Sequence, residues 1–117
     1  RSKIMKKAIS RLLLVLLSST VPFTSANELT GKQIYQAQCS QCHGPQALGN
    51  LALSAPRLAN QQSAYLEEQL QLFQTGQRGS HPQDTNGAIM RSIAASLGPK
   101  QMTQVSHYLS QLPTKRQ

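Results

Sequence analysis

The two cysteines of this 117-residue chain stand in one five-residue segment, Cys39-Ser40-Gln41-Cys42-His43. Residues three and four apart lie on one face of a helix, so both thiols and the imidazole of His43 can be presented to the same object. The order C-x-x-C-H is the pattern of covalent haem attachment, in which the thiols form thioether bonds and the histidine binds the iron. The motif therefore predicts one haem c with its iron, held by Cys39, Cys42 and His43.

Other chemistries use the same cysteine spacing. A structural disulfide or a thiol-disulfide catalyst needs only the two thiols in an oxidising compartment. A catalyst of that type follows a strand in a βαβ unit, and no alternating apolar pattern precedes Cys39. A zinc site needs two further ligands at regular spacing, and the remaining histidines, His81 and His107, are not paired in that way. Both alternatives stay open, although haem attachment is the stronger interpretation.

The first 26 residues have the pattern of a secretory signal. Basic residues precede an uninterrupted apolar run at residues 12–17, and the small residues before Asn27 suit cleavage there. The run is shorter than the ~20 residues of a membrane span, so no stable span is expected after cleavage. The sequence predicts a cleaved signal over residues 1–26, export to the periplasm of a bacterium, and one domain over residues 27–117.

Most of the positive charge belongs to the predicted signal. The chain carries 12 Lys and Arg against 4 Asp and Glu, a net charge of +8. Five of the basic residues and none of the acidic ones fall in residues 1–26, which leaves seven against four, or +3, for the predicted domain. No Lys and Arg cluster remains, so nucleic acid is not expected as a partner. A domain this small gains much of its stability from a staple such as a large prosthetic group.

Apolar residues recur at helical spacing in four places, and no run alternates like a strand. Thr30 and Gln33 form a capping box at the first helix, and Pro99 suits the first turn of the last one. One long loop without periodicity follows the haem motif, and a second precedes the third helix. Such loops need an object to wrap. We therefore expect an all-α fold, with about four short helices and two long loops around one haem. The predicted helices cover residues 30–39, 63–76, 89–97 and 99–112.

A six-coordinate haem needs a second axial ligand, and a thioether in that position raises the reduction potential. Met90 follows the polar loop at residues 77–87 and opens the short third helix, so we expect it to bind the iron opposite His43. Met102 lies on the apolar stripe of the last helix, where core packing is the more ordinary role. His81 is the second choice, and His107 lies beside the stripe. An open sixth site is the functionally different outcome.

With these features the chain resembles the class I cytochromes c, and among them the small bacterial monohaem branch that includes cytochrome c-five and the single domains of cytochrome c-four. The likeness covers residues 29–113, and only the haem motif in it is sharply specific. The residues and segments that carry it are Gly31, Tyr35, 39–43, Gly44, 55–59, 65–70, 89–91, 93–95 and 108–109.

The resemblance implies roles for particular residues. The first and last helices would cross at Gly31, with Tyr35 and Tyr108 packed near the crossing. The carbonyl of Pro56 would accept the Nδ1 proton of His43 and orient the imidazole. Met90 matches the distal methionine of the family. The candidates to pair with the haem propionates are Arg57, Arg78 and Arg91, and the sequence does not choose among them.

The sequence thus predicts an electron-transfer protein and not an enzyme. We expect a one-electron carrier between respiratory redox partners such as a membrane cytochrome complex or a terminal oxidase or reductase. Two alternatives are an electron-transfer subunit of a larger oxidoreductase, and a haem ligand sensor or weak peroxidase with an open sixth site. Because few basic residues remain after signal cleavage, we expect docking through an apolar rim around the haem edge rather than through a ring of lysines.

Overall fold

The computed structural model describes residues 28–115 of the chain. The predicted signal and its cleavage site before Asn27 lie outside the described residues, and so do the last two residues of the predicted domain. No helix among the described residues is both long and apolar enough to cross a membrane.

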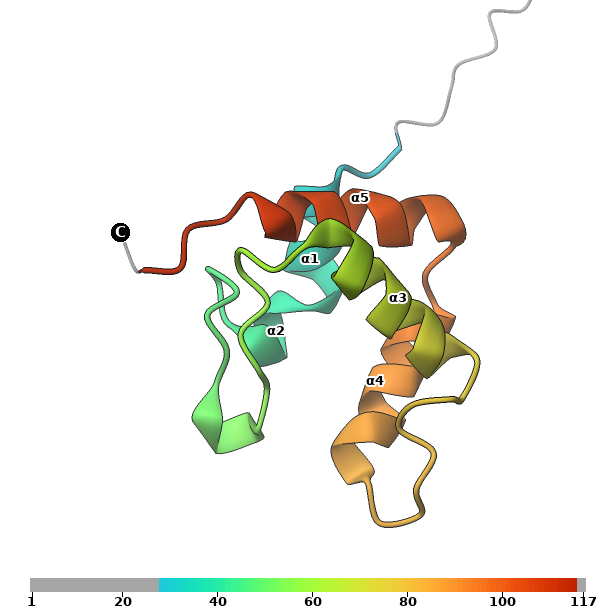
Figure 1. The fold of residues 1–117 in the computed structure, drawn as a ribbon. Coiled ribbons are helices and arrows are strands. Elements are labelled where there is room, and N and C mark those ends of the chain that lie inside the picture. Colours follow the sequence, from blue (N-terminus) through green and yellow to red (C-terminus); the bar gives the residue numbers. More distant parts are fainter. Residues whose placement is uncertain (1–27, 116–117) are drawn as a thin grey trace, which may run out of the picture.

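The described chain is helical, as the sequence predicts (Figure 1). An isolated bridge between Asn50 and Ala55 is its only strand-like pairing in residues 28–115. The elements in chain order are α1 (Gly31–Gln38), α2 (Ser40–His43), the 3-10 helix η1 (Leu51–Leu53), α3 (Ser63–Gln74), α4 (Thr85–Ala95) and α5 (Pro99–Ser110).

Five α-helices are present in the described residues where four were expected, because a separate short helix, α2, follows the end of the first predicted helix at Cys39. This residue has φ −120° and ψ −38°, and it ends α1 and precedes α2. The predicted capping box is present at the start of α1: the amide of Thr30 donates to Gln33 Oε1 at 2.8 Å, and the amide of Gln33 donates to Thr30 Oγ1 at 3.2 Å. The two halves of the capping box satisfy backbone donors that a helix start leaves without partners.

Helix α4 begins at Thr85, four residues before the predicted start, so the loop at residues 77–87 is shorter than expected. The carboxylate of Asp84 accepts from the amide of Gly87 at 2.7 Å and caps the first turn. Position 87 in this turn requires glycine, because a Cβ there would lie 2.6 Å from the Cα of Gly79. Met90 therefore sits in the middle of α4 rather than opening a helix.

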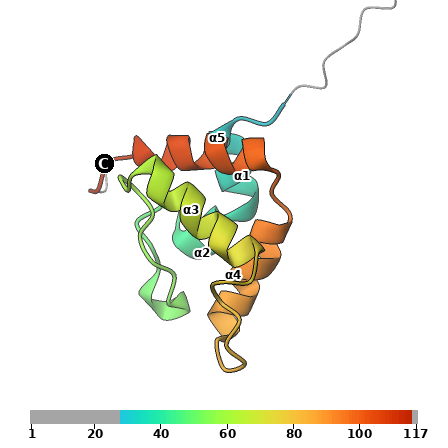
Figure 2. The same cartoon turned by 45° about the vertical axis from the view of Figure 1, so that its right-hand side comes forward.

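The core lies where α1, α3 and α5 meet. In Figures 1 and 2, α5 lies across α1. Helices α3 and α4 form one flank of the domain, and the loop that carries η1 forms the other. Each large side chain buried there stabilises the fold by about 1.5–3 kcal/mol. The core includes Ile34, Tyr35, Leu66, Leu97, Met102, Val105 and Leu109.

The crossing of α1 and α5 at Gly31, which the resemblance implies, is present. A Cβ at Gly31 would overlap the carbonyl oxygen of Gln104 and lie 2.9 Å from the Cβ of Tyr108. The rings of Tyr35 and Tyr108 pack near the crossing, with centroids 5.9 Å apart. The missing side chain at Gly31 is what allows the two helices to approach this closely.

Candidate functional site

The C-x-x-C-H segment forms a single helical turn. The amides of Cys42 and His43 both donate to the carbonyl of Cys39, at 3.3 and 3.0 Å. Gly44 ends the turn with φ +87°, a conformation that L side chains rarely adopt. Cys39 is partly buried against the core, Cys42 is exposed, and His43 is 5% exposed. The turn therefore carries two thiols and a buried imidazole within five residues.

The imidazole of His43 is held by one hydrogen bond. Its Nδ1 lies 2.8 Å from the carbonyl oxygen of Pro56, the residue named from the resemblance. A carbonyl can only accept, so Nδ1 carries the proton and Nε2 keeps its lone pair. No hydrogen-bond partner for Nε2 lies among the described residues. This tautomer leaves Nε2 available as a metal ligand, and the bond to a backbone carbonyl raises its basicity.

The loop between α2 and α3 brings Pro56 to His43. The amide of Gly49 donates to the carbonyl of His43 at 2.9 Å, and the amides of Leu58 and Ala59 donate to that of Ala47 at 2.9 and 3.0 Å. Gly49 has φ +86°, and a Cβ on it would lie 2.8 Å from the carbonyl oxygen of Ala55. These bonds fold residues 44–59 back on themselves, and the position of the Pro56 carbonyl follows from that closure.

Tyr35 supports the same turn from the core. Its hydroxyl donates to the carbonyl of Gly44 at 2.5 Å. Burial of the ring raises the pKa of Tyr35 above its ordinary value, so the phenol stays protonated and remains a donor. Sequence reasoning placed Tyr35 at a helix crossing and missed this bond, as it missed the role of Gly49. The Gly49-Asn50 pair is a turn signal that could have pointed to the latter.

The state of the thiols bears on the alternative chemistries. Both cysteines are free, and burial raises the pKa of the Cys39 thiol to about 11. A thiol-disulfide catalyst needs a thiolate at neutral pH, which this environment disfavours at Cys39. Within the described residues, no group of three or more His, Cys, Asp or Glu side chains is placed to hold a metal ion. The described geometry therefore favours neither thiol-disulfide catalysis nor an all-protein zinc site.

A cavity of about 730 Å³ adjoins the turn. Its lining includes Gly44, which follows His43, and Pro56, whose carbonyl holds the imidazole. Cys39, Cys42 and His43 themselves are not among the residues that line it. The full lining is Gly44, Pro45, Gln46, Leu48, Gly49, Asn50, Leu51, Ala52, Ala55, Pro56 and Arg57.

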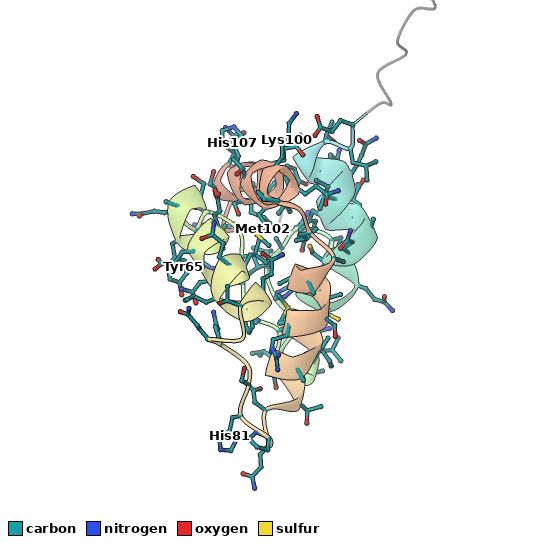
Figure 3. All side chains as sticks on the ribbon, turned by 90° about the vertical axis from the view of Figure 1, so that its right-hand side faces the viewer. Tyr65, His81, Lys100, Met102 and His107 are labelled. Atoms are coloured by element: carbon teal, nitrogen blue, oxygen red, sulfur yellow. The ribbon has the colours of Figure 1, made fainter. Side chains whose placement is uncertain are left out.

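The four candidates for a second axial ligand lie in different environments. Met102 is 1% exposed inside the core, as its apolar stripe predicts (Figure 3). His107 lies on the outer face of α5, 3.1 Å from Gln111 Nε2, and His81 lies at the far tip of the loop before α4 (Figure 3). Met90 is half-buried on α4 and does not belong to the core cluster.

The donor set suits a covalently attached haem. Two free thiols stand three residues apart, and a buried imidazole next to them has one nitrogen anchored and the other bare. An all-helical domain with this attachment turn belongs to the class of c-type haem proteins.

Comparison with known proteins narrows the class. The family model described as Cytochrome c matches residues 29–113, and the chain belongs to the cytochrome c family. As a member it carries a covalently bound haem c with its iron.

Individual relatives agree with this assignment. The chain is 39% identical to cytochrome c4 of Azotobacter vinelandii over 74 residues, which are 63% of this chain and 34% of that protein. It is 34% identical to cytochrome c-554(547) of Halothiobacillus neapolitanus over 86 residues, 70% of this chain and 92% of that one. The crystal structure of reduced cytochrome c4 from Pseudomonas stutzeri superimposes with a TM-score of 0.60 at 31% identity, covering 71% of this chain and 46% of that one. The chain thus spans about a third of the length of the cytochrome c4 relative, which confirms the resemblance to one domain of such a protein.

Proposed function

We propose that this chain is a periplasmic monohaem cytochrome c that carries one electron at a time between respiratory redox partners and is not itself a catalyst. Cys39 and Cys42 would form the thioether bonds to the haem, and His43 and Met90 would bind its iron. The observation that carries the proposal is the buried imidazole of His43, whose Nδ1 is 2.8 Å from the Pro56 carbonyl and whose Nε2 is bare.

The haem supplies a reversible one-electron change at its iron, and the protein sets the conditions for it. Pro56 orients the His43 ring through Nδ1, and Tyr35 holds the end of the attachment turn through Gly44. A Met90 thioether bound to the iron would favour electron transfer over oxygen chemistry. Residue roles of this kind describe a carrier, since they leave no open site for a substrate at the iron.

Location and partners form part of the proposal. Export rests on the signal pattern at residues 1–26, which lie outside the described residues. For partners we propose a membrane cytochrome complex or a terminal oxidase or reductase, in keeping with relatives named as cytochromes. Docking through an apolar rim predicts that the association rate falls only weakly with salt, and a steep salt dependence would contradict it.

Optical spectroscopy of the purified holoprotein tests the ligand assignment. We expect a methionine-to-iron charge-transfer band in the oxidised protein and no uptake of carbon monoxide by the reduced one. Met90→Ala should abolish the band and admit carbon monoxide. Met102→Ala is the matched control: it should cost about 2–5 kcal/mol of stability because it empties a core position, and keep the band. Loss of the band in Met102→Ala with its retention in Met90→Ala would refute the assignment. Carbon monoxide uptake by the unmutated protein would instead indicate a sensor or peroxidase.

A further inference from the structure

Helix α4 carries Met90, and among the described helices it packs mainly against α3 (Figures 1 and 2). Ala94 lies one turn after Met90 on the same face of α4 and is completely buried. Leu97, just beyond the end of the helix, is 2% exposed and belongs to the core cluster. The last turn of α4 is therefore fixed in the core, and Met90 lies one turn before that fixed end.

One side chain of α3 holds this end of α4. Nε2 of Gln74 donates to the carbonyls of Ala94 and Leu97, at 3.1 and 3.0 Å. The NH2 group of a side-chain amide has two hydrogens, so it serves both carbonyls at once. Carbonyls at the end of a helix have no partner within the helix and depend on such donors. Among residues 28–115, Gln74 is the one donor to the carbonyl of Leu97.

A second link joins the same end of α4 to the haem attachment segment. The hydroxyl of Ser96, the residue after α4, donates to Gln38 Oε1 at 2.7 Å. Gln38 is the last residue of α1 and directly precedes Cys39. This bond is exposed to solvent, where water competes for both partners, whereas the two bonds of Gln74 are partly buried. Gln74 is therefore the stronger hold on α4.

We propose that Gln74 is a positioning residue for Met90, an inference that rests on the proposed function above. The two expected iron ligands belong to different helices, His43 to α2 and Met90 to α4. The main packing contacts between the described helices run from α2 through α1, α5 and α3 to α4. Gln74 ties the last joint of that series, so it limits how far α4 can move relative to the attachment turn. Partners that hold a ligand in place in this way tune metal sites without touching the metal.

Cyanide uptake by the oxidised holoprotein tests this role, because cyanide reaches the iron only after Met90 has left it. At high cyanide concentration the rate of uptake equals the rate at which Met90 leaves. Gln74→Leu keeps the charge and roughly the size of the side chain and removes both donors. It should raise the limiting rate about three- to tenfold, the change expected from the loss of ordinary hydrogen bonds. The methionine-to-iron band should persist, since the ligand itself is unchanged.

Two further variants separate positioning from other effects. Gln71→Leu is the matched control, because Gln71 is exposed on the same helix, three residues earlier, and takes the same substitution. It should leave the limiting rate of cyanide uptake unchanged. Gln74→Lys is the conservative variant, because an ammonium group can donate to both carbonyls. It should return most of the way to the unmutated rate.

Three results would overturn the proposal. The limiting rate of Gln74→Leu could equal that of Gln71→Leu, or Gln74→Lys could be as fast as Gln74→Leu. Gln74→Leu could also lower the unfolding midpoint and leave the rate unchanged, in which case Gln74 serves stability alone. Gln74 is exposed, so its replacement leaves the core untouched and the variants should fold.

The spectrum of the unmutated protein separates this proposal from the function itself. Absence of covalent haem or of the methionine band there would refute the proposed function. A normal spectrum with an unresponsive Gln74→Leu would refute the positioning role alone.

Discussion

Replacing Gly31 by alanine tests the helix crossing on which the core is built. The new Cβ would overlap the carbonyl oxygen of Gln104, lie 2.8 Å from the carbonyl carbon of that residue, and lie 2.9 Å from the Cβ of Tyr108. Two of these three atoms belong to the backbone of α5, so rotation of a side chain cannot relieve the overlap. Carbon atoms in contact normally stand about 3.5–4.0 Å apart, so α1 and α5 must separate by roughly 1 Å at the crossing.

The cost follows from known responses to overpacking. Adding a methyl group to a well-packed core costs about 1–3 kcal/mol, and contact with backbone atoms favours the upper end. The higher helix propensity of alanine stabilises a helix interior by up to about 1 kcal/mol relative to glycine. This gain is smaller at position 31, because it is the first residue of α1. We expect Gly31→Ala to lower the free energy of unfolding by about 2–3 kcal/mol. For a domain of this size, that corresponds to a midpoint about 10 °C lower or more.

Thermal and denaturant unfolding of the holoprotein, followed by circular dichroism, measures the effect. Gly98→Ala is the matched control because a Cβ there meets only the flexible end of Gln101, at 3.9 Å. The control should cost less than about 1 kcal/mol, which reflects the poor fit of alanine at a helix N-cap. If Gly31→Ala destabilises no more than Gly98→Ala, the reasoning about the crossing is wrong.

Three further changes probe the attachment turn and the core. Tyr35→Phe removes the hydrogen bond to Gly44 and should cost about 1 kcal/mol of stability. Because burial raises the pKa of Tyr35 in the folded protein, the unmutated protein should lose stability as the pH rises above about 10. The variant should lose less in thermal melts between pH 8 and 11. Gly49→Ala should destabilise the protein more than Gly44→Ala in urea titrations. Both glycines have positive φ, but a Cβ at Gly49 would lie 2.8 Å from a backbone oxygen, whereas a Cβ at Gly44 would lie 3.5 Å from one. Equal costs would mean that backbone strain alone matters. Ser106→Ala should leave stability unchanged or raise it, because the buried Oγ has no partner among the described residues, and a loss above about 1 kcal/mol would show that it has one.

Local patterns in the sequence predicted much of the fold. The capping box at Thr30, the start of α3 at Ser63 and the proline-led start of α5 lie where the pattern placed them. Each depends on residues three or four apart, which the sequence displays directly. The start of α4 was predicted late because the capping carboxylate of Asp84 precedes the apolar stripe from which that helix was recognised.

The haem motif was likewise readable from the sequence, because its chemistry depends on residues within one helical turn. Which residues complete the site could not be read in the same way. The hydrogen bond from His43 to Pro56 spans 13 residues and exists only because the loop between them closes on Gly49 and Ala47.

The haem motif, the helical class and the charge that remains after the predicted signal follow from the order of the residues alone. Only the folded chain shows that the Tyr35 hydroxyl donates to the Gly44 carbonyl, that Arg78 rests on Phe73, and that Arg57 lines the cavity beside the attachment turn. A residue type limits what a side chain can do. Burial and neighbouring partners, which distant parts of the chain set, decide which of those roles the side chain takes.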